Sequence, residues 1–243
     1  MRSRLGERLA GLATAICTAV VVIAIAILPF LTPAWVSFEQ GRTGAARLTG
    51  FTEAELATAT NAILHDLVLG PPTFAVEVSG RPVLEERERA HMRDVRGVFA
   101  GFYLLALVAA VAVVLLIAGA RRLGHPERAW RAVRNGMRGL ILAVVIAGVL
   151  ATFFFDAAFE LFHRLFFPGG SYTFDPRTDR LVQLFPFDFW SETTLAVGGV
   201  IVLLGALVWF AAGRLGGRSV AAQPAPAGPP AGASQPASSG GAR

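Results

Sequence analysis

The sequence predicts an integral membrane protein, a bundle of four transmembrane α-helices with a small α+β cap on the outer side of the membrane. Three observations carry this prediction. Hydrophobic residues make up 54% of the 243 residues, and charged residues make up only 16%. The apolar residues gather in four long blocks, and most arginines gather near the ends of those blocks. Neither this composition nor this clustering of apolar residues and arginines is typical of a soluble domain.

The four apolar blocks are each long enough to cross a hydrocarbon core, which takes about 20 residues of α-helix. They comprise residues 9–31, 98–120, 139–159 and 194–212. The first block has the position of a signal peptide, but its apolar stretch is too long and no small-residue cleavage site follows it. We therefore interpret it as a span. Its lone cysteine, Cys17, excludes a disulfide within the chain and is expected to be a small packing residue.

The arginines predict how the spans are oriented. The chain has no lysine, so its 22 basic residues are all arginine. Twelve arginines and two acids lie at the termini and around the middle loop, for a net charge of +10. The other ten arginines face fifteen acids, for −5, and the two values add to the formal +5. The positive-inside rule then predicts that both termini and the middle loop are cytoplasmic.

The same distribution excludes one partner class. The isoelectric point near 10.8 is typical of proteins that bind nucleic acid. Here the basic excess follows the ends of the spans, so we expect no nucleic-acid partner.

The first outer segment, residues 32–97, is long enough to form part of the cap. Thr52 and Glu55 match a capping box, in which a hydroxyl and a carboxylate satisfy free amides at the start of a helix. An amphipathic helix is predicted to follow, because apolar residues then recur at helical spacing, namely Leu56, Ala59, Ile63, Leu64, Leu67 and Val68. A short strand is predicted at residues 74–78. From about Pro82 the chain is predicted to be helical into the second span.

The second outer segment, residues 161–191, has a different pattern. Two β-prone runs, residues 171–174 and 181–185, are separated by a turn sequence, which predicts a β-hairpin. Its many aromatic residues suit the headgroup layer, and an aromatic belt with no further role is the alternative. The predicted membrane domain comprises residues 1–213. The remaining residues, 214–243, are rich in Pro, Gly, Ala and Ser and are predicted to be disordered.

Two of the four histidines are predicted to lie at the same outer face of the membrane. His91 comes just before the second span and His163 just after the third, so the two imidazoles share a similar depth. Asp156 lies inside the apolar end of the third span, where burying an ionisable group is costly, and this makes it a functional candidate. A salt bridge from Asp156 to Arg164 or Arg96 is the alternative.

The residue types around this pair indicate acid–base chemistry. Asp94 and Arg87 lie three and four positions from His91, on the same face of a helix. A neutral imidazole can accept a proton, and a nearby donor can stabilise the charge that develops. The sequence has no zinc motif and no motif of a serine or cysteine nucleophile. We therefore predict no metal, no cofactor and a substrate that supplies its own nucleophile. His65 and His125 are interpreted as surface residues.

The blocks HMRDVRGVF, before the second span, and FHRLFFPGGSYTFDPRTDRLVQLFP, after the third, resemble a family of four-span bacterial membrane proteins that includes the lipoprotein intramolecular transacylase. The resemblance covers residues 9–213. It implies a plasma-membrane acyltransferase that moves the sn-2 acyl chain of a diacylglyceryl-cysteine to the α-amine of the same cysteine. It also implies a diacylglyceryl lipoprotein and membrane lipid as partners, and His91 and His163 as catalytic residues.

Several charged residues near the two histidines complete the predicted site. They are expected to support catalysis or to orient carbonyl groups and lipid headgroups: Arg87, Arg93, Arg96, Arg164, Asp94 and Asp156. The alternative function is a non-catalytic lipid- or lipoprotein-binding membrane protein, which has no need for paired histidines. Transport is disfavoured, because Thr14, Cys17 and Thr18 are the only polar candidates at mid-membrane and no internal repeat is visible.

Overall fold

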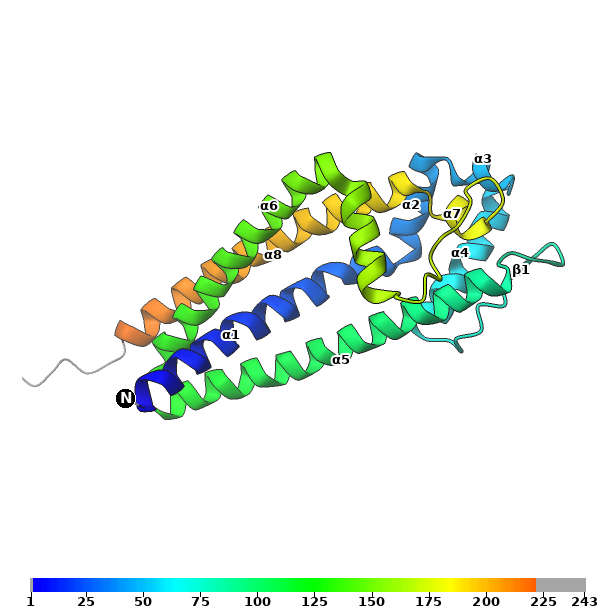
Figure 1. Cartoon of the computed structure of the whole chain (residues 1–243). Coiled ribbons are helices and arrows are strands. Elements are labelled where there is room, and N and C mark those ends of the chain that lie inside the picture. The colour runs from blue at the N-terminus through cyan, green and yellow to red at the C-terminus, as the bar shows by residue number, and fades with distance from the viewer. Residues whose placement is uncertain (1, 222–243) are drawn as a thin grey trace, which may run out of the picture.

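The computed structural model describes residues 2–221 of the chain, with side chains for residues 4–218. Four long helices form a bundle, namely α1 (Arg2–Ile27), α5 (Glu86–Arg122), α6 (Pro126–Phe166) and α8 (Phe187–Ala221). They run along the length of the molecule (Figure 1). Each helix is long and apolar enough to cross a membrane, as the four apolar blocks predict.

Small and branched apolar side chains pack the bundle. α6 packs along α8, and α1 packs against α5, α6 and α8. The buried core between the helices includes Val22, Ala26, Val133, Met137, Ile201 and Ala212. Gly136 lets α1 and α6 approach closely, because a Cβ built there would lie 2.8 Å from the Cα of Ala15.

Two buried threonines of α1 are satisfied by their own helix. The Thr14 hydroxyl donates to the carbonyl of Ala10 at 2.8 Å, and the Thr18 hydroxyl donates to the carbonyl of Thr14 at 2.7 Å. A hydroxyl that bonds back to its own backbone needs no partner on a neighbouring helix. These side chains therefore leave the surface of α1 effectively apolar towards the rest of the bundle.

The cap lies at one end of the bundle and has its own hydrophobic core (Figure 1). It comprises η1 (Leu28–Leu31), α2 (Pro33–Thr43), α3 (Ala45–Thr49), α4 (Glu53–Val68), β1 (Glu77–Val78), β2 (Arg81–Pro82) and α7 (Arg180–Leu184). Side chains of α2 link the cap to α8, since Trp35 Nε1 donates to Thr193 Oγ1 at 3.2 Å and Arg42 pairs with Glu192 at 2.6 Å. The predicted fold class, a four-span helical bundle with a small α+β cap, is confirmed.

α4 is the amphipathic helix predicted for the first outer segment. Its capping box is formed, since the Glu55 N–H donates to the Thr52 hydroxyl at 3.3 Å and the Thr52 N–H donates to the Glu55 carboxylate at 3.0 Å. Leu56 and Ile63 pack into the cap core. α5 then continues without interruption into the second span, as the sequence predicts, but it begins at Glu86 rather than near Pro82, which lies in β2.

The β-hairpin predicted for the second outer segment is wrong. Residues 171–179 form turns, and the following residues form helix α7. The helix is favoured because Leu181 and Leu184, three positions apart, both lie on its buried face. The two-stranded sheet lies instead in the first outer segment, where β1 and β2 pair antiparallel across a tight turn.

α6 bends at Phe154, whose backbone angles (φ −132°, ψ 32°) are not helical. Two residues earlier, the Thr152 hydroxyl donates to the carbonyl of Gly148 at 2.9 Å, a type of contact that often bends helices. Beyond the bend, α6 runs back across the bundle towards α5 (Figure 1). The predicted third span, residues 139–159, therefore contains the bend, and the part of α6 that follows carries His163 to α5.

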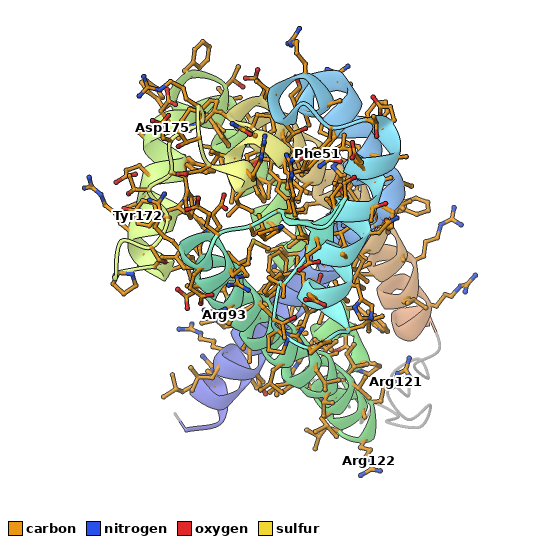
Figure 2. The ribbon with its side chains drawn as sticks, turned by 90° about the vertical axis from the view of Figure 1, so that its right-hand side faces the viewer. Phe51, Arg93, Arg121, Arg122, Tyr172 and Asp175 are labelled. Carbon is orange, nitrogen blue, oxygen red and sulfur yellow. The ribbon has the colours of Figure 1, made fainter. Side chains whose placement is uncertain are left out.

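The end of the bundle opposite the cap holds the start of α1, the connection between α5 and α6 and the end of α8 (Figure 1). Arg121 and Arg122 extend from α5 at this end (Figure 2). α8 continues through residues 214–221, which composition predicts to be disordered. The rest of the predicted disordered tail, residues 222–243, lies outside the described residues.

Candidate active site

The imidazoles of His91 and His163 stack where α5 meets the bent part of α6. Their ring centroids are 6.1 Å apart and their planes differ by 24°. α5 has 37 residues. At a rise of 1.5 Å per residue it is about 55 Å long, whereas a hydrocarbon core is about 30 Å thick, so part of the helix protrudes. His91 lies on this charged, protruding part, before the apolar stretch of residues 98–120.

His91 is buried, with 6% of its surface exposed, and aromatic rings enclose it. The rings of Phe167 and Phe174 form edge-to-face contacts with the imidazole, with centroids 4.8 and 5.5 Å away. Burial, followed by repulsion from His163, lowers the pKa of His91 to about 4, against the opposing charge of Asp94. Its Nδ1 is buried without a hydrogen-bond partner among the described residues. This nitrogen is therefore unpaired inside the aromatic enclosure.

His163 is held in one tautomer by its own helix. Its Nδ1 lies 2.7 Å from the carbonyl oxygen of Phe159, which can only accept a hydrogen bond. Nδ1 therefore carries the proton, and the free lone pair is on Nε2. The rings of Phe159 and Tyr172 pack against the imidazole, with centroids at 4.1 and 5.0 Å, and hold its plane.

The loop after α6 is tied to the helix that carries His163. The Tyr172 hydroxyl donates to the Glu160 carboxylate at 3.1 Å, and Arg164 Nε donates to the same oxygen at 2.7 Å. Arg164, which the sequence predicts to orient substrate, thus forms an ion pair with Glu160, one turn earlier on the same helix. Glu160 in turn holds the Tyr172 ring that packs on His163.

A second set of contacts ties the same loop to α5. Arg87 donates to the carbonyl of Thr173 at 2.8 Å and to Asp179 at 2.7 Å. Its guanidinium carbon also lies 5.0 Å from the centre of the Phe174 ring. Because Arg87 lies one turn before His91 on α5, these contacts hold Phe174 against the imidazole.

Glu88 is buried beside these contacts, with 1% of its surface exposed. Its carboxylate accepts the N–H groups of Leu181 at 2.6 Å and Glu85 at 2.7 Å, which joins α7 to the start of α5. Sequence reasoning missed Glu88 and Asp179 as supports of the site. Within the run ERERAH, no pattern separates the buried Glu88 from the exposed Glu86.

Two other arginines that the sequence predicts to belong to the site, Arg93 and Arg96, form hydrogen bonds with groups other than the histidines. Arg93 donates to Glu86 at 2.7 Å. Arg96 donates to the carbonyl oxygens of Asp66 and Gly70, at the end of α4. Arg96 therefore fastens α4 to α5.

Asp156 is exposed just beyond the bend of α6. Within the described part of the chain it forms no hydrogen bond or ion pair. The alternative ion pairs are not formed, because Arg164 pairs with Glu160 and Arg96 binds carbonyl oxygens. The structure therefore does not bring Asp156 into contact with His163.

A groove of about 510 Å³ opens beside the paired histidines. It is lined from α5 by Arg93, Asp94, Gly97 and Val98, and from the facing segment by Phe166, Phe167, Pro168, Gly169 and Ser171. Figure 2 labels Arg93 on α5 and Tyr172 in the facing loop. Phe167 lines the groove and also packs against both imidazoles, so the groove adjoins the pair directly.

The groups gathered here suit proton transfer. Over the described residues, no three His, Cys, Asp or Glu side chains gather as metal ligands. The site instead offers two imidazoles of different environment, one buried and one with a fixed tautomer, beside a groove that carries a carboxylate. Two such imidazoles can divide the tasks of accepting a proton and donating a hydrogen bond.

Comparison with known proteins identifies the family. The chain matches the family model described as lipoprotein intramolecular transacylase Lit over residues 11–190. The chain belongs to the lipoprotein intramolecular transacylase family. Both sequence blocks that carry the predicted resemblance lie inside this match, and the predicted family is confirmed.

Solved structures of this transacylase have the same fold. The membrane-integral enzyme of Bacillus cereus matches with a TM-score of 0.74 at 19% sequence identity, over 89% of this chain and 98% of that chain. Two variants of that enzyme, with arginine or alanine in place of one histidine, match with the same TM-score at 17% identity. These matches cover 91% and 90% of this chain, and 96% and 98% of theirs. The chain is therefore a multi-pass membrane protein with the transacylase fold.

A curated relative from Aquifex aeolicus (strain VF5) is described as an uncharacterized protein. It is 30% identical over 136 residues, which make up 54% of this chain and 57% of the relative. This chain thus matches a little more than half the length of that relative. The transacylase family assignment comes from the family model.

Proposed function

We propose that the chain is an active lipoprotein intramolecular transacylase. It moves an acyl chain of a diacylglyceryl-modified lipoprotein from the glycerol to the α-amine of the lipid-bearing N-terminal cysteine. The observation that carries the proposal is the stacked pair of imidazoles, His91 and His163, in an aromatic enclosure beside a groove. The substrate class follows from the family.

The proposed enzyme lies in the bacterial plasma membrane, with both termini in the cytoplasm and the site at the extracytoplasmic face. The distribution of charge supports this orientation. Arginines are concentrated at the end of the bundle opposite the cap, and include Arg121, Arg122 and Arg128. Loops rich in arginine are retained on the cytoplasmic side. The cap and the histidines then face the side on which lipid-modified proteins are displayed.

In the proposed reaction, His163 deprotonates the α-ammonium group through Nε2. The lone pair is available there because Nδ1 donates to the Phe159 carbonyl. The same hydrogen bond persists when His163 is protonated, and the carbonyl oxygen then stabilises the imidazolium. This first proton passes to solvent, which leaves a neutral amine and a neutral His163.

The neutral amine then attacks the carbonyl carbon of the ester. His163 accepts a proton from the attacking nitrogen and delivers it to the departing glycerol oxygen. The C–N bond forms and the C–O bond to glycerol breaks. The products are an N-acyl amide, a free glycerol hydroxyl and the one proton released at the start. No side chain of the enzyme becomes acylated, because the substrate supplies the nucleophile.

His91 stays neutral in this scheme and donates a hydrogen bond to the developing oxyanion. The lowered pKa of His91, about 4, supports this role, since it favours the neutral form beside a protonated His163. A neutral imidazole carries one N–H, which is the donor that an oxyanion requires. Holding amine and ester within one substrate also supplies a large effective molarity.

A non-catalytic lipoprotein-binding protein is the second candidate function. The groove favours it, because a concave and largely apolar surface can bind a lipid chain without any chemistry. Binding alone, however, has no use for two imidazoles in a stacked arrangement. The two functions therefore differ in what replacement of His91 or His163 does.

The deciding experiment follows acyl transfer by mass spectrometry. Purified protein in detergent is mixed with a synthetic diacylglyceryl lipopeptide, and fragmentation shows whether a chain has moved to the N-terminal amine at constant total mass. His91→Ala and His163→Ala are each expected to slow transfer by roughly 10²- to 10⁴-fold. His125→Ala, at an exposed histidine near the opposite end of the bundle, is the control and keeps the wild-type rate. No transfer by folded wild type would contradict the proposal and favour the binding function.

A further inference from the structure

One wall of the groove carries a negative charge without a cationic partner. The Ser171 hydroxyl donates to the Asp94 carboxylate at 3.2 Å, and Ser171 is the only hydrogen-bond partner of Asp94 within the described part of the chain. The neighbouring Arg93 also lines the groove, but it pairs with Glu86 at 2.7 Å. Asp94 therefore presents to whatever enters a carboxylate that has no ion-pair partner of its own among the described residues.

The rest of the groove suits an aliphatic group. Val98, Phe166 and Phe167 supply apolar walls. At Gly97 and Gly169 an added Cβ would meet nothing within 4 Å, so the groove is open at both positions. A carboxylate beside an apolar channel fits a cationic amine attached to a lipid.

We infer that Asp94 recognises the free α-ammonium group of the substrate and thereby selects lipoproteins whose N-terminal amine is not yet acylated. The inference rests on the proposed function and names the residue that chooses its substrate. Asp94 follows His91 by three positions on α5, so the two Cβ atoms are about 5–6 Å apart on one side of the helix. An ammonium group bound to Asp94 therefore lies beside the paired imidazoles.

The same contact distinguishes substrate from product. The substrate nitrogen is positively charged and forms a charge-assisted hydrogen bond with the carboxylate. After transfer the nitrogen belongs to a neutral amide, and the ion pair is lost. Asp94 therefore binds the substrate more tightly than the product, which favours release of the product from the groove.

The test measures binding without turnover. A diether analogue of the diacylglyceryl lipopeptide, whose chains cannot be transferred, is made with a free N-terminal amine and with an N-acetylated one. The full chain in detergent is expected to bind the free amine roughly fivefold more tightly, as for an ion pair that stays partly exposed to water. Asp94→Asn is expected to bind both analogues equally. Glu77→Gln, at an exposed acid of β1 outside the groove, keeps the wild-type preference.

An unchanged preference in Asp94→Asn overturns the inference, and so does a wild type that binds both analogues equally. If Asp94→Asn fails to fold, the wild type decides. Raising the salt from about 0.05 to about 0.5 M must then weaken its preference, because salt screens exposed charges, and a salt-independent preference overturns the inference. An amine preference without acyl transfer contradicts the proposed function alone. Acyl transfer without an amine preference contradicts this inference alone.

Discussion

The bundle and the cap satisfy their buried polar groups in different ways. In the bundle, the Thr18 hydroxyl bonds within its own helix. In the cap, Gln40 donates to the carbonyl of Leu184 at 3.0 Å, and Glu88 accepts from the N–H of Leu181. Polar groups of the bundle thus leave each helix free to pack through apolar contacts. Those of the cap determine which distant segments meet, and they shape the enclosure of His91.

Replacing Glu88 is expected to show this contrast most strongly. Glu88→Ala leaves the buried N–H of Leu181 and the part-buried N–H of Glu85 without their acceptor. We expect the free energy of unfolding in detergent to fall by roughly 2–4 kcal/mol, since one buried and one part-buried N–H lose an acceptor that is a carboxylate. Hydrogen exchange should rise at the Leu181 amide.

The matched change in the bundle is Thr18→Val. It removes a hydroxyl that bonds only within its own helix. The free energy of unfolding should therefore change by less than about 1 kcal/mol, since no other group loses its hydrogen-bond partner except the Thr14 carbonyl of the same helix. A loss as large as that of Glu88→Ala would show that the bundle and the cap do not differ in this respect.

Acidification is expected to destabilise the cap through His91. The pKa of this imidazole is about 4 in the folded protein, below its ordinary value of 6.5. The unfolded chain therefore takes up this proton first as the pH falls. The contribution of neutral His91 to the free energy of unfolding is fully present above pH 6.5 and is lost as the pH falls towards 4. The loss reaches up to roughly 3 kcal/mol.

Unfolding of wild type and His91→Phe, followed at pH 7 and pH 4.5, checks this effect. The variant keeps an aromatic ring at this position but has no group that titrates there. Its stability should therefore fall less than that of wild type between the two pH values. Equal losses in both proteins would show that other groups cause the acid sensitivity.

Overpacking the contact between α1 and α6 tests the bundle side of the comparison. Gly136→Ala places a methyl group against Ala15 and is expected to cost about 1–3 kcal/mol of stability. Gly139→Ala is the control, because an added Cβ there meets nothing within 4 Å. Transfer per folded molecule should stay at the wild-type rate in both variants, since neither position lines the groove. A slower rate in folded Gly136→Ala would show that bundle packing also sets the geometry of the site.

The smallest expected effect concerns the loop that covers His91. Arg87→Lys keeps the charge but cannot reach both Thr173 and Asp179 while lying over Phe174. We expect kcat to fall about tenfold, equivalent to about 1.4 kcal/mol, with little change in thermal unfolding. Arg89→Lys, whose arginine pairs with Glu86 within one turn of α5, should keep the wild-type kcat. Equal kcat values in all three proteins would show that the loop position does not limit transfer.

The comparison also explains what the sequence could predict. Spans depend on local composition, so three of the apolar blocks fall within α5, α6 and α8, and the first block ends in η1, directly after α1. The similar depth of His91 and His163 follows from the same pattern, because the two spans end on one side of the membrane. The bend at Phe154 carries no proline or glycine signal, and only the structure reveals how His163 reaches α5.

The cap was predicted less well, because its structure depends on contacts between distant segments. Leu181 and Leu184 fit both a β-prone run and one turn of helix, and burial in the cap core selects the helix. The sequence indicates that Arg96 binds substrate, but in the structure Arg96 donates to carbonyl oxygens at the end of α4. Charged residues in a short run cannot be sorted by role from spacing alone.

The measurement that tests the central claim most directly compares transfer rate constants in His91→Ala, His163→Ala and the double variant. Single-turnover reactions with the diacylglyceryl lipopeptide give the rate of the chemical step. If the two imidazoles act as one unit, the double variant is slower than the slower single variant by no more than about twofold, because losing either one already disables the pair. A double variant whose rate falls by the product of the two single effects would contradict the account and show that the histidines act independently.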